Sequence, residues 1–314
     1  MNRKRIAVII INYRTADLVI DCLQSLSGEL QADVDVAIVV DNLSGDGSID
    51  RIEYEVGQQK WNQWVTIIRS DRNGGYSYGN NLGIRNIDSE IFIFANSDTL
   101  IRQGAVECLY HALQSEQKVG IIGPRLEWPD GEVQVSCFRN MTPVSELLAA
   151  ACTGIVTKLF RRHDVPVSPS SRPMDADWIS FAFVALRRTV VEQIGMLDEG
   201  YFMYFEDLDY CRRVRRRGWR IHYCPDARVV HLQSGSSQVN SLTASRGRRP
   251  AYYYASRSRY FAKYYGRLGL VCANLLWIAG RSISLLRELS GHKKPHVCER
   301  ESRDIWINWW SPFK

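Results

Sequence analysis

No stretch of this sequence offers the roughly 20 consecutive apolar residues that a membrane-spanning helix requires. The chain also lacks a C-x-x-C pair, which argues against a zinc site or a disulfide framework and indicates reduced, mostly buried thiols. The first apolar run, residues 6–11, is too short for a secretory signal, and Asn12, Tyr13 and Arg14 follow it in place of a small-residue cleavage site. We therefore expect a buried first strand and a cytoplasmic protein. The eight cysteines are Cys22, Cys108, Cys137, Cys152, Cys211, Cys224, Cys272 and Cys298.

The composition is that of a folded chain with two unlike parts. Of 314 residues, 45% are hydrophobic and 11% are aromatic, which excludes a disordered chain. The length suits one large domain, or one domain with an appendage. The net charge of +6 conceals an asymmetry, because residues 1–240 hold 26 basic and 30 acidic side chains whereas residues 241–314 hold 14 and 4. We predict a slightly acidic domain over 1–240 and a basic, aromatic-rich tail over 241–314.

Short apolar runs alternate with helical patterns over the first 120 residues. The runs are 6–11, 36–40, 64–68, 91–95 and 119–122, and the helical stretches include one that Thr15 can cap and one over roughly 103–117. This alternation predicts βαβ units and an α/β fold with a mostly parallel sheet flanked by helices. Ligands of such sheets bind beyond the carboxyl ends of the strands.

The pattern is less regular beyond residue 123. We expect a loop-rich insertion over 124–176, then a strand over 178–186 and helices over 189–194 and 206–217. Short strands are expected over 220–223 and 227–232. The polar stretch 234–249 is rich in Ser, Gly and Arg and is expected to be mobile.

Two aspartates directly follow predicted strands. Asp41 ends the second run, and Asp98 lies in Asn-Ser-Asp-Thr after the fourth. A carboxylate beside hydroxyl groups suits a hard divalent cation that bridges to phosphates, although capping of a turn or helix explains each motif taken alone. Two such strand ends at one edge of a sheet point to a shared ligand, with capping as the alternative.

A glycine-containing turn follows the third predicted strand. Asn73-Gly74-Gly75 either brings backbone amides close to a diphosphate or forms an ordinary turn. It is not the G-x-G-x-x-G pattern of dinucleotide-binding proteins, and no acidic residue closes such a unit at the expected place. A Rossmann-type oxidoreductase is therefore disfavoured.

The densest functional pattern is the segment 198–209, in which an aromatic run leads into Glu206, Asp207 and Asp209 at the start of a predicted helix. Arginines at the far end of that helix make macrodipole complementarity an alternative explanation of the charges, but not of the aromatic run. Aromatic surroundings raise carboxyl pKa values and can prepare one carboxylate as a general base. His231, at the end of a later predicted strand, is either structural or a metal ligand.

The order of these motifs resembles the family 2 glycosyltransferases, particularly their rhamnosyltransferase-like branch. The longest matching segment is 201–213, Tyr-Phe-Met-Tyr-Phe-Glu-Asp-Leu-Asp-Tyr-Cys-Arg-Arg, and the ordered series covers about residues 5–235. The other segments are 8–13, 39–42, 73–75, 80–83, 94–99, 177–180, 187–188, 195–199, 218–219 and 225–231. The resemblance implies a GT-A (Rossmann-like) fold with a C-terminal helical extension.

The resemblance also implies an activity: inverting, metal-dependent transfer of a sugar from a nucleoside diphosphate in cell-surface polysaccharide synthesis. The implied donor is dTDP-rhamnose or a UDP-sugar, and the implied acceptor is a glycan or a polyprenyl-linked glycan. Asp41 corresponds to the family's contact to the donor's pyrimidine base, and Asn12 and Tyr13 line the same pocket. The other donor-binding residues that it implies are Asn73, Gly74, Asn80, Asn96, Asp98 and Trp178.

Metal and catalytic roles follow from the same resemblance. Asp98 matches the last Asp of the D-x-D motif, which holds Mg²⁺ or Mn²⁺ on the donor diphosphate. His231 matches a histidine that completes the metal site in some members. Asp207 matches the general base that deprotonates the acceptor hydroxyl, and Glu206 would orient it or bind the acceptor.

Two positions depart from the family pattern. Asn96 stands where many relatives have the first Asp of D-x-D, which leaves one metal carboxylate. Phe181 stands where relatives usually have Gly, so its ring could narrow the sugar pocket. These departures leave an alternative open: a GT-A-fold nucleotide- or glycan-binding protein with little or no turnover.

The tail combines tyrosines with arginines and lysines, and residues 268–280 are uncharged. This 13-residue run is too short to span a bilayer but suits the membrane interface, and its basic flanks favour an anionic surface. A helical hairpin packed on the catalytic domain, or a homodimer contact, is the alternative. Nucleic acid is disfavoured, because no nucleic-acid-binding motif accompanies the charge. We therefore expect a cytoplasmic enzyme that can act peripherally on the cytoplasmic face of the plasma membrane.

Overall fold

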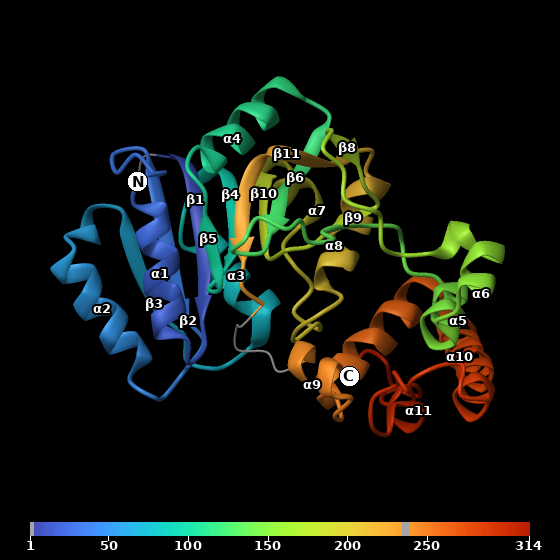
Figure 1. The fold of residues 1–314 in the computed structure, drawn as a ribbon. Coiled ribbons are helices and arrows are strands. Elements are labelled where there is room, and N and C mark those ends of the chain that lie inside the picture. The colour runs from blue at the N-terminus through green and yellow to red at the C-terminus, as the bar shows by residue number, and fades with distance from the viewer. Residues whose placement is uncertain (1–2, 234–238) are drawn as a thin grey trace. The chain divides into compact units, whose positions relative to one another are not determined.

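The computed structural model describes residues 3–233 and 239–314 and divides the chain into two compact units (Figure 1). Part of the polar stretch expected to be mobile, 234–238, lies outside the described residues. The first unit comprises Met1–Phe138, Ser168–Glu199 and Tyr210–Ser236, and the second comprises Arg139–Val167, Gly200–Asp209 and Ser237–Lys314. The domain division predicted at residue 240 stays a prediction.

The first unit is built on a sheet of nine strands among the described residues, in the order β3-β2-β1-β4-β10-β6-β11-β5 with β8 paired to β11. Strands β3, β2, β1 and β4 are parallel neighbours, whereas β10 is antiparallel to both β4 and β6. This arrangement confirms the predicted α/β class. The strands are β1 Lys4–Asn12, β2 Asp35–Asp41, β3 Val65–Arg69, β4 Ser89–Asn96, β5 Thr99–Ile101, β6 Val119–Glu127, β8 Met174–Asp175, β10 Phe183–Arg187 and β11 Arg220–His231; β7 Cys137–Phe138 pairs separately with β9 Trp178–Ile179.

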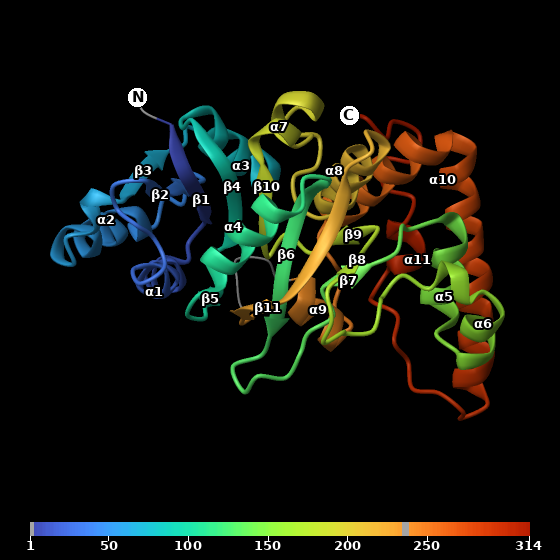
Figure 2. The ribbon, with the colours of Figure 1, turned by 90° about the horizontal axis from the view of Figure 1, so that it is seen from above.

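Helices cover both faces of this sheet. On one face α1 (Ala16–Leu26), α2 (Ser48–Gln58) and α4 (Ala105–Ser115) bury leucine, valine and isoleucine side chains against alternate strand residues such as Val8. The other face carries α3 (Gly75–Arg85) and α7 (Arg188–Ile194), and Figure 2 shows them across the sheet from α4. Because both faces of β1 are covered, its residues 6–10 form an uninterrupted buried apolar run.

Glycines determine how closely α3 approaches the sheet. A Cβ atom on Gly83 would lie 2.6 Å from Cγ2 of Ile9, and one on Gly79 would lie 3.0 Å from Cδ1 of Ile11. Only a helix with glycines on this face can pack so near to β1. The segment after Asn73-Gly74-Gly75 contains further glycines, which disfavour a helix, so its helical conformation depends on tertiary packing.

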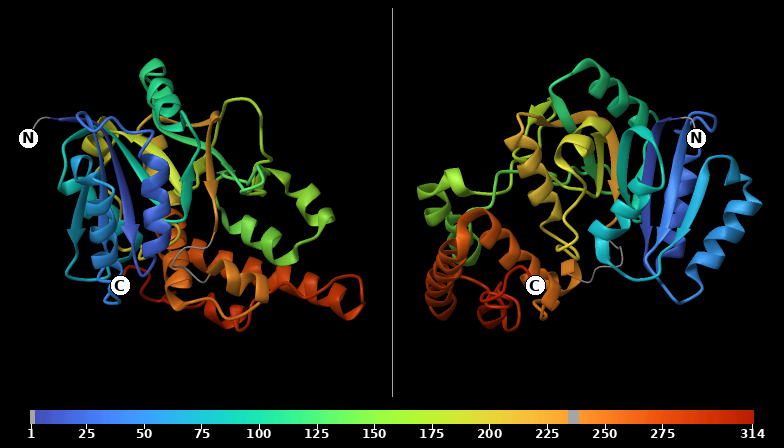
Figure 3. Two further views of the ribbon diagram at one scale, coloured as in Figure 1. Left: turned by 60° about the vertical axis from the view of Figure 1, so that its left-hand side comes forward. Right: turned by 180° about the vertical axis from the view of Figure 1, so that it is seen from behind.

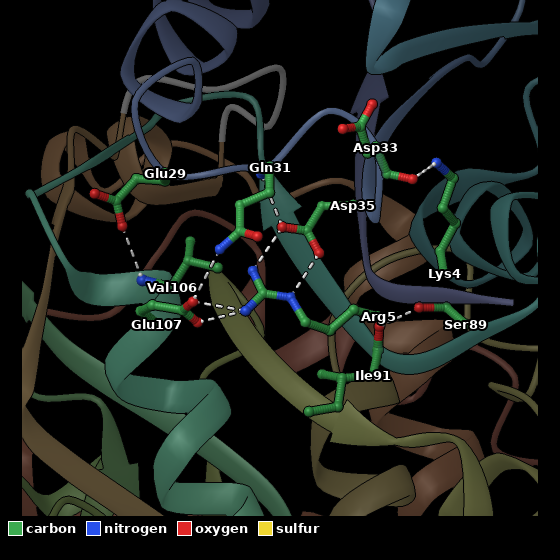
Figure 4. Close-up of polar contacts among 10 residues, drawn as sticks. All are labelled: Lys4, Arg5, Glu29, Gln31, Asp33, Asp35, Ser89, Ile91, Val106 and Glu107. Atoms are coloured by element: carbon green, nitrogen blue, oxygen red, sulfur yellow. Dashed lines mark hydrogen bonds and ion pairs between the residues drawn. The ribbon is translucent and has the colours of Figure 1, made fainter.

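An ion-pair cluster holds the amino ends of the strands (Figure 4). Arg5 donates to both oxygens of Asp35, at 2.9 and 2.7 Å, and to Glu107 of α4 at 2.6 Å. Asp35 is fully buried and also accepts the backbone N–H of Gln31 at 2.9 Å. The cluster ties β1, β2 and α4 together at the edge opposite to the strands' carboxyl ends.

Several predicted elements are corrected by the structure. The single strand expected over 178–186 is two strands, β9 and β10, and the strands expected over 220–223 and 227–232 form one irregular strand, β11. The insertion over 124–176 contains helices α5 and α6 that its irregular sequence pattern does not indicate. Thr15 occupies the position before α1, but its hydroxyl accepts no hydrogen bond from the helix and instead donates to Asn12 Oδ1. All eight cysteines are free, which confirms that prediction.

The second unit is helical. It contains α5 Pro143–Ala151, α6 Gly154–Leu159, α9 Val239–Ser245, α10 Ala251–Leu289, α11 Glu301–Asp304 and the first residues of α8 Glu206–Arg216; short 3₁₀ turns lie at Trp61–Gln63 in the first unit and Arg161–His163 in the second. Gly266 (φ 70°, ψ 175°) breaks α10 into two stretches. Helix α5 lies beside α10 in both views of Figure 3. Of the helices in the described residues, α10 alone is long and apolar enough to cross a membrane by length and composition.

Candidate active site

Asn12 and Asp41 form the centre of a polar network at the carboxyl edge of the sheet. They end β1 and β2 and lie opposite each other in the parallel register. Asn12 Nδ2 donates to Asp41 Oδ1 at 2.7 Å, and also lies 3.1 Å from Ser44 Oγ and 2.9 Å from Ser48 Oγ. Ser44 donates its hydroxyl to Asp41 Oδ1 (2.5 Å) and its backbone N–H to Oδ2 (3.1 Å). The predicted base-binding carboxylate is therefore held in one orientation.

The loops that follow β1 and β2 each contain a strained residue. Arg14 (φ 60°) and Leu43 (φ 55°) adopt the left-handed conformation, which costs a non-glycine residue about 1–2 kcal/mol. Arg14 Nε donates to the carbonyl oxygen of Ser44 at 3.0 Å, and its guanidinium lies 5.1 Å from the ring centroid of Tyr13. Strain of this kind is concentrated at ligand-binding sites. Here it places a cation over the ring predicted to line the nucleotide pocket.

The start of α3 lies beside this network. Asn42 donates to the carbonyl oxygen of Gly75 at 2.9 Å, and Asn73 Oδ1 accepts the N–H of Gly75 at 3.1 Å. Gly74 occupies the position before the helix, where a Cβ atom would collide with Tyr78. The structure therefore brings Asn73 and Gly74 to a helix N-terminus, which suits an anionic ligand.

Unsatisfied polar atoms surround the same helix. Asn42 Oδ1, Ser77 Oγ and Asn80 Oδ1 are buried without a hydrogen-bond partner. An unsatisfied buried polar group costs about 1–3 kcal/mol, so three of them at one place are expensive for a purely structural element. Asn80 Nδ2 does have a partner, the carbonyl oxygen of Tyr76 at 3.0 Å.

Asp98 and His231 meet where β5 pairs with β11. Nε2 of His231 lies 3.6 Å from Oδ1 of Asp98, and both side chains are largely buried. Burial lowers the pKa of His231, with Asp98 acting in the opposite sense, so the neutral imidazole that ligates metals is favoured. Asn96 ends β4 opposite Ile11 of β1. Within the described residues no group of three or more His, Cys, Asp or Glu side chains forms a metal site.

This pair fits an incomplete metal site. A carboxylate and an imidazole are ligands that Mn²⁺ accepts, and Mg²⁺ commonly uses one or two carboxylates together with substrate phosphates. Asp98 and His231 would thus supply two ligands, and the remaining positions would be left for diphosphate oxygens and water.

Trp178 lies in β9, and Phe181 follows that strand, where its backbone carbonyl oxygen accepts the hydroxyl of Tyr76, in the first turn of α3, at 2.6 Å. The ring of Trp178 stacks on Phe138 at a centroid distance of 4.0 Å within the separate β7–β9 pair. Phe181 is 3% exposed, and its ring contacts Phe94 and Tyr210. The ring is therefore packed among other aromatic side chains of the first unit, and its effect on a sugar pocket stays a prediction.

Glu206 and Asp207, in the second unit, begin α8 and differ in their surroundings. Glu206 is buried, and its Oε2 has no hydrogen-bond partner, whereas Asp207 is half-buried. Burial raises the pKa of Glu206 well above its ordinary value of 4.5, and the charges of Asp207 and Asp209 raise it further. A protonated Glu206 beside a more accessible Asp207 is a chemically sensible pairing of an orienting group and a proton acceptor.

The residues before this pair form a strained turn. Tyr204 (φ 69°) and Phe205 (φ 68°) are consecutive left-handed residues without the freedom of glycine. The first stretch of α10 holds them in place: Ser256 Oγ donates to the carbonyl oxygen of Met203 at 3.0 Å, and the ring of Tyr253 lies 5.6 Å from the rings of both Tyr204 and Phe205.

Asp209 anchors the same segment to α10. Its fully buried carboxylate accepts the Tyr264 hydroxyl at 2.8 Å and the Lys263 ammonium at 2.6 Å, both at Oδ1. Tyr201 lies 3.5 Å from the same oxygen. The tail is therefore part of the framework that shapes the Glu206–Asp207 turn.

Four of these positioning residues carried no sequence signal. Ser44 and Ser48 fix the Asn12–Asp41 pair, and Lys263 and Tyr264 fix Asp209. The serines lie in an ordinary Ser/Gly/Asp-rich loop, and the two tail residues are far from position 209 in the chain. The one related signal was the tyrosine and lysine content of the tail, which is compatible with packing as well as with a charged surface.

A family model described as "Glycosyltransferase like family 2" matches residues 3–255. The chain belongs to this family, which confirms the resemblance read from its motifs. The matched region ends within the first stretch of α10, so it includes Tyr253 but not Lys263.

Named relatives are glycosyltransferases of several organisms. The chain is 28% identical over 206 residues to an N-acetylglucosaminyl-diphospho-decaprenol L-rhamnosyltransferase of Mycobacterium tuberculosis, covering 63% of this chain and 62% of that protein. It is 29% identical over 233 residues to the low-salt glycan biosynthesis hexosyltransferase Agl10 of Haloferax volcanii, covering 73% and 67%. The chain thus spans less than two thirds of the length of the mycobacterial relative.

Solved structures share the fold at low identity. The mannosyltransferase PcManGT from Pyrobaculum calidifontis, in complex with GDP-Man and Mn²⁺, aligns with a TM-score of 0.57 at 15% identity, covering 100% of this chain and 83% of that one. GalNAc-T7 with UDP, GalNAc and Mn²⁺ aligns with a TM-score of 0.60 at 12% identity, covering 98% and 56%. These likenesses confirm the predicted GT-A fold.

Replacement of Glu206 by glutamine should make stability less dependent on pH. A raised native pKa means that native Glu206 keeps a proton that the unfolded chain releases above about pH 4.5, so wild-type stability falls as pH rises beyond that value. Glu206→Gln has no such proton. In thermal scans, the unfolding midpoint of Glu206→Gln minus that of wild type should therefore become more positive from pH 5 to pH 8.

An exposed glutamate on β4 provides the control, because Glu90→Gln should leave the wild-type pH profile unchanged. A Glu206→Gln difference that is the same at every pH would contradict the buried, protonated carboxyl.

Removal of the Tyr264 hydroxyl should loosen the turn that precedes Glu206 and Asp207. Tyr264→Phe leaves the buried Asp209 carboxylate with one donor fewer, at a cost of about 1–3 kcal/mol. Amide hydrogen exchange in a peptide covering 201–209 should accelerate by about tenfold or more.

Tyr265→Phe is the matched control, since that hydroxyl donates to the carbonyl oxygen of Met141 at 2.7 Å. It should cost comparable stability without faster exchange in 201–209. Equal acceleration in both variants would show general destabilisation and not a specific anchor.

Proposed function

We propose that this protein is an inverting, metal-dependent glycosyltransferase that moves a sugar from a nucleoside diphosphate to a glycan or lipid-linked glycan. The observation that carries the proposal is the Asp98–His231 pair placed at the strand-end edge that also holds Asn12 and Asp41. Membership of family 2 supports sugar transfer as the chemistry. The donor, the metal and the stereochemical outcome are the finer parts of the proposal.

The donor's nucleotide would bind at the ends of β1 and β2. Asp41 keeps two oxygens fixed by Asn12 and Ser44, so a base N–H can approach it without loss of its orientation. Tyr13 would stack on the base or ribose, and the Arg14 cation would draw the diphosphate toward this edge.

The diphosphate would meet the start of α3 and the metal ligands. Gly74 permits close approach of the backbone at that helix N-terminus, and Asn73 shapes the turn. Asp98 and His231 would hold Mn²⁺ or Mg²⁺. When bound, the ion would neutralise charge that develops on the leaving diphosphate.

Asp207 would act as the general base. It would take the proton of an acceptor hydroxyl while that oxygen forms a bond to the anomeric carbon and the bond from this carbon to the diphosphate oxygen breaks with its electron pair. A single displacement inverts the anomeric configuration and needs no covalent intermediate. Glu206, protonated and buried, would donate a hydrogen bond that orients Asp207 or the acceptor.

The relatives' names support rhamnose as the transferred sugar. Those relatives include the mycobacterial L-rhamnosyltransferase, the rhamnosyltransferase WbbL of Escherichia coli and a dTDP-rhamnosyl transferase of Shigella flexneri. A dTDP-sugar is accordingly the first donor to test, with UDP-sugars next. The mycobacterial name also supports a polyprenyl-linked acceptor, which would place the enzyme peripherally on the cytoplasmic face of the membrane.

Replacement of Asp207 by asparagine should abolish transfer and preserve donor binding. A general base contributes about 10²–10⁴-fold, so radiolabelled rhamnose passing from dTDP-rhamnose to a polyprenyl-linked N-acetylglucosamine acceptor should fall by at least 100-fold. Thermal stabilisation by dTDP should persist, because Asp207 touches the acceptor and not the nucleotide.

Asp226→Asn, at an exposed position on β11, should keep wild-type transfer and serves as the control. Substantial transfer by Asp207→Asn would remove it from the role of base. A wild-type protein that binds nucleotide but gives no product with any donor would instead favour the binding-protein alternative that Asn96 leaves open.

A further inference from the structure

The second stretch of α10, residues 267–289, carries an apolar face that the described residues of the second unit leave open to solvent. Six large side chains on it are 38–86% exposed: Leu268, Leu275, Ile278, Leu285, Leu286 and Leu289. Successive members are seven, three, seven, one and three residues apart, and these steps keep them on one side of a helix. We call these six residues the outer face. Cys272 is also exposed on this side, and the helical period places the charged residues within the segment 268–289, Arg281, Arg287 and Glu288, off it.

The opposite side of the same helix is already occupied. A Cβ atom on Gly280 would lie 2.4 Å from the carbonyl oxygen of Leu147, so α5 packs directly against the α10 backbone there. Asn274 is fully buried and accepts Arg257 Nη1 at 2.7 Å, and Arg257 also pairs with the buried Glu146 at 2.7 Å. The helix therefore has one polar, packed side and one apolar, open side.

This asymmetry determines how the helix can meet lipid. A transmembrane orientation would uncover the Arg257–Glu146 pair and place Asn274 in hydrocarbon, which is costly for unpaired polar and charged groups. Lying flat in the interface requires neither change, because only the outer face is buried among the acyl chains. The break at Gly266 separates this stretch from the one that holds the catalytic turn.

The charges beside the outer face are basic. Arg267 and Arg287 lie on its two flanks, and Glu288, the one acidic residue of this stretch, is paired with Arg281 at 2.6 Å. A second exposed set in the same unit repeats the combination: Ile155 and Leu159 of α6 are 83% and 75% exposed, next to exposed Arg161 and Arg162. Basic flanks favour anionic headgroups, whereas two copies of this face would bring like charges together.

We propose that the outer face of α10 docks on an anionic bilayer, with the helix axis parallel to the membrane. The proposal rests on the proposed function for its purpose, since a lipid-linked acceptor has to be met at a bilayer. The surface itself stands on the geometry of the second unit alone.

Cys272 provides a direct probe of this contact. Cys152 and Cys272 are the two exposed cysteines, so Cys152→Ser leaves a single readily accessible thiol on the outer face. Modification of Cys272 by polyethylene glycol maleimide should slow at least tenfold when vesicles containing 30% phosphatidylglycerol are added. Pure phosphatidylcholine vesicles should give little protection. The same rate with both vesicles and without them would overturn the proposal.

Charge substitutions on the outer face should abolish sedimentation with anionic vesicles. Leu275→Glu together with Leu286→Glu should reduce the bound fraction at least tenfold. Tyr54→Glu, at a 66% exposed position on α2, should bind like wild type. Thermal stabilisation by dTDP should be equal in all three proteins, so loss of vesicle binding alone leaves the proposed function intact.

Three other results would also overturn the proposal. Wild-type sedimentation of the double glutamate variant would exclude the outer face as the contact. Resistance of bound wild type to extraction at alkaline pH would show a spanning helix. A dimer in light scattering that the double variant dissociates, without vesicle binding, would show that a second copy covers this face.

Discussion

Asn12 lies opposite Asp41, and Ile11 lies opposite Asn96, because β1 pairs in parallel with both β2 and β4. This register gathers the polar ends of three strands at one edge of the sheet. The close packing of α3 on β1, the strained loops after β1 and β2 and the Asp98–His231 pair all depend on it. The Arg5–Asp35–Glu107 cluster secures the opposite ends of the same strands. A shift of one residue in β1 would separate Asn12 from Asp41.

The basic tail has two distinct roles on this account. Its first stretch provides Ser256, Tyr253, Lys263 and Tyr264 to a turn that adopts an unfavourable backbone conformation just before Glu206. Its second stretch packs one side on α5 and leaves the other apolar. The packing of both stretches within the second unit is observed, whereas the membrane contact of the second stretch is our proposal. Gly266 allows both within one helical segment.

Local patterns were sufficient for much of the fold and for the positions of the strand-end residues. The runs that form β1, β2 and β4 are apolar and β-branched, and a parallel sheet places their carboxyl ends together whatever the long-range details. Asp41, Asp98 and His231 could therefore be proposed as site residues from position alone. The approach of Asp98 to His231 within the first unit, however, depends on the pairing of β5 with β11, which no local pattern indicates.

Other features have no local cause and could not be predicted. Glycines give α3 a low helix propensity, and the helix exists because Gly79 and Gly83 allow contact with β1. Tyr204 and Phe205 have side chains that disfavour a positive φ. The packing of α10 against them holds this conformation. The ring of Phe181 contacts Phe94 and Tyr210, which are distant from it in the chain, so its surroundings could not be read from the sequence.

In the proposed function, the strand-end edge binds a nucleoside diphosphate through a metal held by Asp98 and His231. Thermal shift with dTDP and UDP, each with and without Mn²⁺, tests it most directly, with Asp98→Asn as the comparison. We expect dTDP to stabilise wild type, Mn²⁺ to increase that stabilisation, and Asp98→Asn to lose the Mn²⁺-dependent part. Absence of stabilisation by either nucleotide in the presence of Mn²⁺ would contradict it.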